Sequence, residues 1–170
     1  MKRWNYYLVF SLLAVAQMVL SNYFTFTPYI LLSILPVMVL TIPIRVNTVW
    51  AMCVAFVTGL AVDLLSEGLI GINALALVPV AFARNGILSL VFGEDLFSRN
   101  EDFSIHKNGF AKVLLSIVLA QALFMIIYVW ADGAGMRSFW FNFARFFLSV
   151  AGSSIVSLFV INVLAPDHRK

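Results

Sequence analysis

The class of fold follows from residues 49–92, which read VWAMCVAFVTGLAVDLLSEGLIGINALALVPVAFARNGILSLVF. It contains two apolar blocks, 49–65 and 69–92, which are separated by a short turn at 66–68. A block of roughly 17–25 apolar residues is long enough to cross the hydrocarbon core of a bilayer as an α-helix. The stretch therefore predicts two membrane-spanning helices that are joined by a tight turn.

Four further apolar blocks occupy most of the remaining chain. Together with the first two they give candidate spans at residues 6–20, 29–44, 49–65, 69–92, 113–131 and 139–165. The blocks 6–20 and 29–44 are short for a bilayer, because about 16 residues rise only about 24 Å in a helix. Pro28 begins the second block, Pro43 ends it, and Pro36 in its middle predicts a kink.

The composition of the whole chain is that of a membrane protein. Of its 170 residues, 62% are hydrophobic and 11% are charged, whereas soluble domains have about 45–50% apolar and about 25% charged residues. Such a composition excludes a soluble enzyme domain, a disordered tail and a nucleic-acid-binding module. The single cysteine, Cys53, excludes an intramolecular disulfide. We expect an all-α integral membrane protein with one domain, a compact bundle of six transmembrane helices.

Basic residues indicate the orientation of this bundle, because cytoplasmic loops collect Lys and Arg. With six spans, one side receives Lys2, Arg3, Arg45, Arg99, Lys107, Lys112, Arg169 and Lys170. The other side receives Arg137, with Arg145 near its surface. Both termini are therefore expected in the cytoplasm. A five-span alternative, in which the first two blocks form a re-entrant hairpin, would spoil this asymmetry.

Two polar regions outside the spans need an interpretation. Residues 93–111 form a cytoplasmic loop of mixed charge, which is either simply solvated or a docking segment for a cytoplasmic partner. The basic N-terminus before an apolar run resembles a secretory signal. That run continues to Leu20, however, and five more blocks follow, so we expect an uncleaved membrane anchor.

Ionisable side chains inside apolar blocks are costly, so each is a candidate functional residue. Asp63 lies near the outer end of the third span, four residues after Gly59. The two residues share a helix face, and the glycine lets a neighbouring helix approach the carboxylate. Gly68 and Gly71 bracket the turn into the fourth span. Asp63 is expected to pair locally and fix two helices together, to bind a proton or substrate, or to contact a partner.

Two arginines are the other charged candidates. Arg84 lies in the fourth block near the cytoplasmic side, where we expect it to snorkel toward the headgroups. Arg145 lies near the outer start of the last span, at a depth that suits Asp63. We therefore predict a contact between Asp63 and Arg145.

Uncharged polar residues in the spans predict contacts between helices. Gln17 and Gln121 are expected to form hydrogen bonds across helices. Serine recurs every four residues in the last span, at Ser149, Ser153 and Ser157. This stripe of small residues predicts that two helices pack closely there.

No catalytic or cofactor motif accompanies these residues. The sequence has no Walker loop, no H-E-x-x-H, no G-x-S-x-G and no dinucleotide-binding fingerprint. His106 and His168 lie apart from each other and from any carboxylate cluster with metal-ligand spacing. We expect a non-enzymatic protein without a cofactor or metal, which either binds a small molecule or serves as a helical scaffold.

The junction between the third and fourth spans carries a pattern of glycines and one aspartate. Its members are Gly59, Asp63, Gly68, Gly71 and Asn73, followed by Ala74 and Leu75. This pattern resembles a segment of the MreD family of rod shape-determining proteins, in which many members have histidine at the position of Asn73. The chain length, the six expected spans and the basic N-terminus also resemble that family.

This resemblance implies a scaffold in the bacterial inner membrane, within the elongation machinery that inserts lateral cell wall. The implied partners are a bitopic periplasmic protein like MreC, the actin-like MreB filament, and the elongation-specific glycosyltransferase and transpeptidase. Faces with small residues such as Gly59 would hold a partner's single span. The family is also similar in fold to the S-components of energy-coupling-factor transporters, so the alternative function is a substrate-binding S-component of a vitamin transporter.

Overall fold

In the computed structural model, the described residues are 3–23, 30–65, 70–93, 109–133 and 137–164. Within these ranges the chain is helical apart from short connections and one irregular segment, residues 30–34. The helices are α1 (Arg3–Tyr23), α2 (Leu35–Leu40), α3 (Thr48–Leu65), α4 (Ile72–Phe92), α7 (Phe110–Gly133) and α8 (Phe139–Leu164). The protein is an all-α membrane bundle, which confirms the expected class of fold.

Four helices are long and apolar enough to cross a membrane, namely α3, α4, α7 and α8. The described apolar stretch of α1, Phe10–Asn22, is shorter. These five helices match five predicted spans, with ends that differ by at most three residues. Most of the predicted cytoplasmic loop, residues 93–111, lies outside the described residues, and α7 begins at Phe110.

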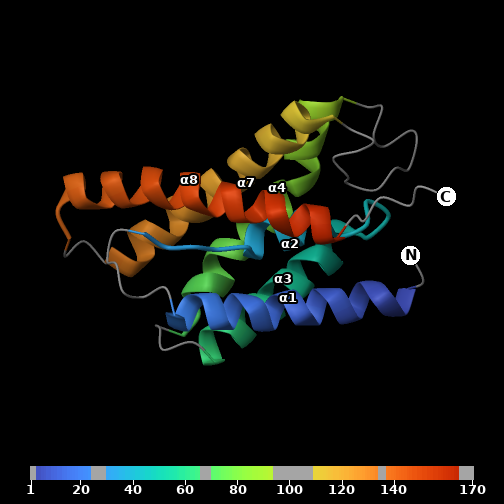
Figure 1. Ribbon diagram of the computed structural model, residues 1–170, viewed down its shortest axis with the longest axis horizontal. Helices are drawn as coiled ribbons and strands as arrows, with labels where there is room; N and C mark the ends of the chain where they lie inside the picture. Colours follow the sequence, from blue (N-terminus) through green and yellow to red (C-terminus); the bar gives the residue numbers. More distant parts are fainter. Residues whose placement is uncertain (1–2, 24–29, 66–69, 94–108, 134–136, 165–170) are drawn as a thin grey trace.

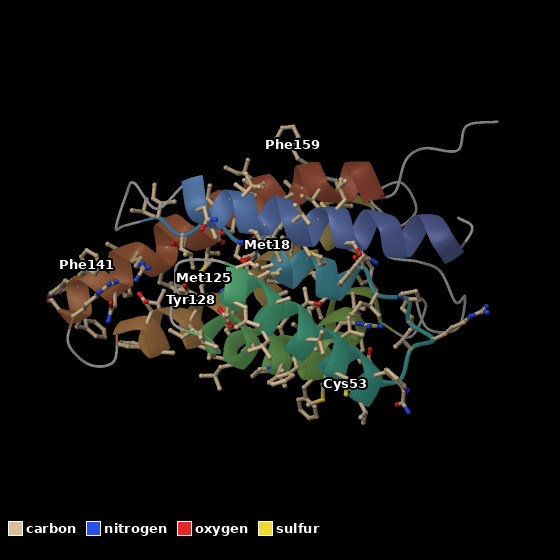
Figure 2. All side chains as sticks on the ribbon, turned by 90° about the horizontal axis from the view of Figure 1, so that it is seen from below. Met18, Cys53, Met125, Tyr128, Phe141 and Phe159 are labelled. Atoms are coloured by element: carbon tan, nitrogen blue, oxygen red, sulfur yellow. The ribbon has the colours of Figure 1, made fainter. Side chains whose placement is uncertain are left out.

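The side chains divide into an interior set and an outward-facing set. Met125 on α7 is fully buried, whereas Phe159 on α8 and Cys53 on α3 are exposed, and Figure 2 shows Phe159 pointing away from the bundle. Large apolar side chains on the outside, such as Phe82 and Leu90 on α4, are also exposed. Because apolar side chains cover the outside as well as the core, the bundle suits a lipid environment.

The second predicted span, residues 29–44, is not a regular membrane-spanning helix. Its described part is the irregular segment, residues 30–34, followed by α2, a helix of six residues that are all buried. Pro36 lies in the first turn of α2, where a missing N–H breaks no helical hydrogen bond, so it begins a helix rather than kinking one. Pro43 follows α2 in a turn, and Pro28 lies outside the described residues.

The irregular segment and α2 pass through the middle of the bundle. Figure 1 shows them running lengthwise between α1 on one side and α7 and α8 on the other. The same view shows α1 beginning and α8 ending at one end of the bundle. We call this end the Arg84 end, since the second half of α4 lies toward it, and the opposite end the Asp63 end. That the Arg84 end faces the cytoplasm stays a prediction.

Candidate functional site

Asp63 at the end of α3 binds the first turn of α4. Its Oδ2 accepts hydrogen bonds from the backbone N–H groups of Gly71 (3.0 Å) and Ala74 (3.3 Å). Its Oδ1 accepts from the backbone N–H (3.2 Å) and the side-chain Nδ2 (2.8 Å) of Asn73. The first turn of a helix leaves its N–H groups without partners inside the helix, so Asp63 is a cap supplied by another helix. The expectation that Asp63 pairs locally and fixes two helices together is confirmed.

Two glycines bring α3 and α4 close enough for this cap. A Cβ atom on Gly59 would lie 2.6 Å from Ala74 Cα and 2.7 Å from Ala74 N, well inside van der Waals contact. Gly71, the residue before α4, has a φ of +99°. Residues with a Cβ atom disfavour this conformation, whereas glycine adopts it readily. Gly68 lies outside the described residues. We call this unit the α3–α4 clamp: Gly59, Asp63, Gly71, Asn73 and Ala74.

The clamp changes the interpretation of Gly59. The close approach expected at this residue is made by the chain's own α4, through the backbone of Ala74. The surface of Gly59 is therefore already covered inside the bundle, and it is not accessible to a partner's transmembrane helix. Asn73, where the resembling family often has histidine, binds the Asp63 carboxylate with both its backbone N–H and its side-chain amide.

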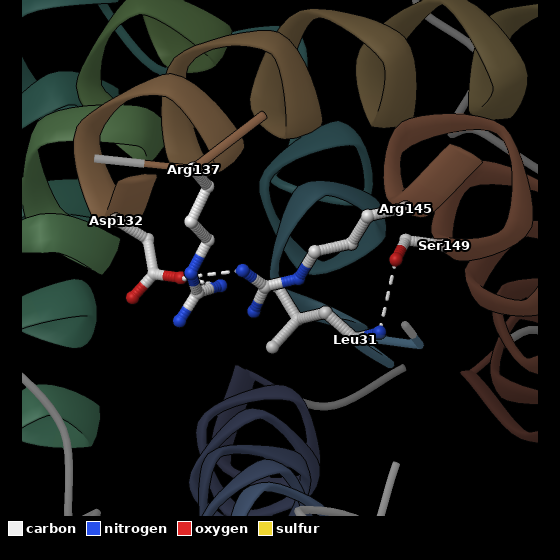
Figure 3. A network of polar contacts seen from close by, with 5 residues as sticks. All are labelled: Leu31, Asp132, Arg137, Arg145 and Ser149. Atoms are coloured by element: carbon white, nitrogen blue, oxygen red, sulfur yellow. Dashed lines mark hydrogen bonds and ion pairs between the residues drawn. The ribbon is translucent and has the colours of Figure 1, made fainter. Parts of the chain in front are cut away.

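Arg145 pairs with Asp132, not with Asp63. Arg145 Nη1 donates to Asp132 Oδ2, and Arg137 Nη1 donates to the same oxygen at 3.1 Å (Figure 3). The predicted contact between Asp63 and Arg145 is therefore wrong. Four donors from Gly71, Asn73 and Ala74 already occupy the Asp63 carboxylate. Asp132, in contrast, lies at the end of α7, next to the start of α8. The signal that we missed was a carboxylate beside the short connection between two adjacent spans.

The serine stripe of α8 binds the backbone of the irregular segment. Leu31 N–H donates to Ser149 Oγ at 2.9 Å (Figure 3), and Ser33 N–H donates to Ser153 Oγ at 3.0 Å. Ser153 Oγ in turn donates to the Leu31 carbonyl at 3.2 Å. Four residues of helix rise about 6 Å, and two residues of extended chain span about 6.6 Å, so the two repeats match. Ser149 and Ser153 thus face an extended backbone instead of a helix, whereas Ser157 contacts Gln121 on α7, as a stripe that packs against a helix would.

Two glutamines complete the partners of the irregular segment. Gln17 Oε1 accepts from Ile34 N–H at 2.7 Å, and Gln17 Nε2 donates to the Leu32 carbonyl at 3.3 Å. Gln121 Nε2 donates to the Ser33 carbonyl at 2.8 Å and to Ser157 Oγ at 2.9 Å. Non-helical backbone at membrane depth needs such partners within the protein. Gln121 bonds across helices, to Ser157 on α8, as predicted, whereas Gln17 on α1 bonds to the irregular segment and not to another helix.

Arg84 has a structural position at the opposite end of the bundle. Its side chain is 1% exposed, and Nη2 donates to the Pro43 carbonyl at 3.1 Å. On the next residue, Asn85 Nδ2 donates to Thr48 Oγ1 at 3.1 Å. These bonds tie α4 to the turn after α2 and to the start of α3. Arg84 is therefore buried among these elements and does not snorkel.

Polar contacts between elements hold the described part of the fold together. They are the α3–α4 clamp, the side chains that bind the irregular segment, the Asp132 ion pairs, and the bonds of Arg84 and Asn85. Among these described residues, no three or more histidine, cysteine, aspartate or glutamate side chains lie close enough to hold a metal ion. No family model matches the chain, and no curated protein or solved structure shows a significant match to it.

Proposed function

We propose that this chain is a non-enzymatic scaffold subunit of the bacterial cell-elongation machinery, in the inner membrane. In this proposal it binds a bitopic periplasmic protein like MreC and the enzymes that build the lateral wall, and it contributes to cell shape. The observation that carries the proposal is the α3–α4 clamp. Five of the residues by which the sequence resembles the MreD family form this clamp, and they act as one unit because Asp63 needs both the close approach at Gly59 and the turn at Gly71.

The outward faces of α3 and α4 are the surfaces that this proposal assigns to a partner's transmembrane span. Trp50 on α3 and Phe82 and Leu90 on α4 are 68%, 67% and 77% exposed. The clamp fixes the two helices against each other at the Asp63 end, so these side chains stand on a rigid pair. A rigid, apolar surface loses little conformational freedom when a partner helix packs against it.

Cross-linking from Cys53 tests this assignment. Cys53 is the chain's only cysteine, and it is exposed on α3. A photoreactive group attached to its thiol in membranes of the native host, followed by purification and mass spectrometry, reports what covers this face. We expect an adduct with a bitopic protein that has a periplasmic coiled coil, and no adduct from Cys53→Ser. Adducts with lipid alone, together with purified material free of wall-synthesis enzymes, would contradict the scaffold proposal.

The same purification addresses the alternative function. Recovery of ATPase subunits and a tightly bound small molecule would make the chain the substrate-binding S-component of a vitamin transporter. A quick independent observation is the gene neighbourhood. Neighbouring genes for an actin-like protein and a coiled-coil protein favour the scaffold, whereas neighbouring ATPase genes favour the transporter.

A further inference from the structure

A cavity lies between the end of α7 and the beginning of α8, at the Asp63 end. It has a volume of about 170 Å³, and its walls are Ile126, Val129, Trp130, Phe139, Asn142, Phe143 and Phe146. A cavity of about 150 Å³ with apolar walls stays dry and accepts a molecule the size of benzene. The cavity between α7 and α8 therefore suits part of an apolar chain.

The only polar side chain in this wall belongs to Asn142. Asn142 is 4% exposed, and its buried Oδ1 has no hydrogen-bond partner among the described residues. A Cβ atom on Gly133 would lie 3.2 Å from Asn142 Nδ2, so the glycine at the end of α7 makes room for this amide. A buried acceptor without a partner is costly in an apolar site. A ligand with a hydroxyl group would supply the missing donor.

The neighbouring charges favour an anion beside the cavity. Arg145, one helical turn after Asn142, and Arg137 share the single carboxylate of Asp132, which leaves an excess of one positive charge (Figure 3). The Arg137 side chain is 41% exposed and uses Nη1 for that ion pair. Its guanidinium carries five N–H donors, so others remain for a phosphate.

Aromatic rings line the cavity, and the Trp140 ring packs beside two of them, Phe139 and Phe143. Trp130 and Phe139 are 52% and 60% exposed, with ring centroids 6.0 Å apart, and Trp140 is 76% exposed. Aromatic side chains of this kind collect where a membrane protein meets the lipid headgroups. The cavity therefore lies where a lipid presents its headgroup and the first part of its chains.

We propose that this cavity binds one anionic phospholipid with a hydroxylated headgroup, of which phosphatidylglycerol is the simple example. Part of an acyl chain occupies the apolar space, the phosphate contacts Arg137, and a headgroup hydroxyl donates to Asn142 Oδ1. The site uses α7 and α8 alone, so it is independent of the scaffold function and of the faces of α3 and α4.

Lipid binding to the purified full-length chain tests this proposal. Native mass spectrometry in mixed micelles is used with phosphatidylglycerol or phosphatidylcholine that carry identical acyl chains. We expect one retained phosphatidylglycerol per chain. Phosphatidylcholine has the same phosphate but lacks the hydroxyl donor for Asn142 Oδ1 and carries a cation, so we expect it to bind more weakly by about tenfold, the factor that one buried acceptor left without a donor supplies. Equal retention of the two lipids would overturn the proposal, because ordinary lipid contacts do not discriminate between headgroups.

Three variants localise the binding. Ile126→Trp fills the cavity, and Leu115→Trp is its matched control, since Leu115 lies on the same helix with a similar exposure, 49% against 46%. We expect Ile126→Trp to lose phosphatidylglycerol and Leu115→Trp to retain it. Arg137→Gln changes an exposed side chain, so it tests the site even if Ile126→Trp does not fold. It should weaken the binding of both lipids, because each carries the phosphate that contacts Arg137. Unchanged binding of phosphatidylglycerol to Arg137→Gln would refute the assignment of the phosphate.

Discussion

Replacing Gly59 by alanine places a methyl group between α3 and α4. The new Cβ would lie 2.6 Å from Ala74 Cα, whereas carbon atoms rest at about 3.5–4.0 Å from each other. The helices must therefore separate by roughly 1 Å at this point. That displacement acts on the α3–α4 clamp, because the Asp63 carboxylate holds Ala74 N–H at 3.3 Å, near the limit of a hydrogen bond.

The expected loss of stability follows from three contributions. Overpacking costs about 1–3 kcal/mol, and one weakened hydrogen bond to the Asp63 carboxylate costs about 1.5–3 kcal/mol. The better helix propensity of alanine offsets about 1 kcal/mol of this. We expect Gly59→Ala to lower the free energy of unfolding by about 1.5–5 kcal/mol.

Gly86→Ala is the matched control for Gly59→Ala. Gly86 also lies inside a helix, α4, but a Cβ atom there meets nothing within 4 Å. The same substitution should therefore raise the free energy of unfolding, by up to about 1 kcal/mol. Unfolding by dodecyl sulfate in mixed micelles, followed by circular dichroism, measures both variants. The reasoning fails if Gly59→Ala is as stable as Gly86→Ala.

Three further substitutions test the α3–α4 clamp and the contacts of the irregular segment by the same unfolding measurement. Asp63→Asn replaces one acceptor oxygen by an NH₂ group that faces N–H donors, and we expect a loss of about 1.5–3 kcal/mol. Combined with Gly59→Ala it should be less than additive, because both weaken one clamp. Gly71→Ala forces a side chain into φ +99° and should cost about 1–2 kcal/mol. Ser153→Ala removes the partner of Ser33 N–H and should cost about 1–3 kcal/mol, whereas Ser89→Ala, at an exposed serine, should be neutral. An equal effect of the two serine changes would contradict the importance of the irregular segment.

Long apolar blocks were sufficient to predict five of the helices, because a helix is the structure by which a single segment satisfies its own backbone in lipid. Apolar length alone was not sufficient for the second block, residues 29–44, whose described part is mostly irregular chain and a short buried helix. A run of apolar residues does not distinguish a lipid-facing helix from a buried segment whose backbone is satisfied by other parts of the chain. The distinguishing residues, Ser149 and Ser153, lie on another helix.

The partner of each charged residue was predictable only in part. Asp63 sits four residues after a glycine and just before a turn, so local pairing with the next helix was one of the three possibilities that the sequence allowed. The partner of Arg145 could not be predicted, because the depth of a residue in the membrane restricts the possible partners without selecting one of them. Asp132 and Asp63 both lie at the same end of the bundle, and the packing of α7 on α8 selects Asp132.

The irregular segment has a consequence for how the protein is made. The N–H groups of Leu31 and Ser33 precede the serines that bind them by 118 and 120 residues. A ribosome delivers the chain from its N-terminus, so these groups enter the membrane region long before α8 exists. Until then, water, lipid headgroups or the insertion machinery must satisfy them. Biogenesis of this small bundle therefore ends with the docking of its last helix, and loss of α8 would leave the backbone N–H groups of Leu31 and Ser33 without their partners.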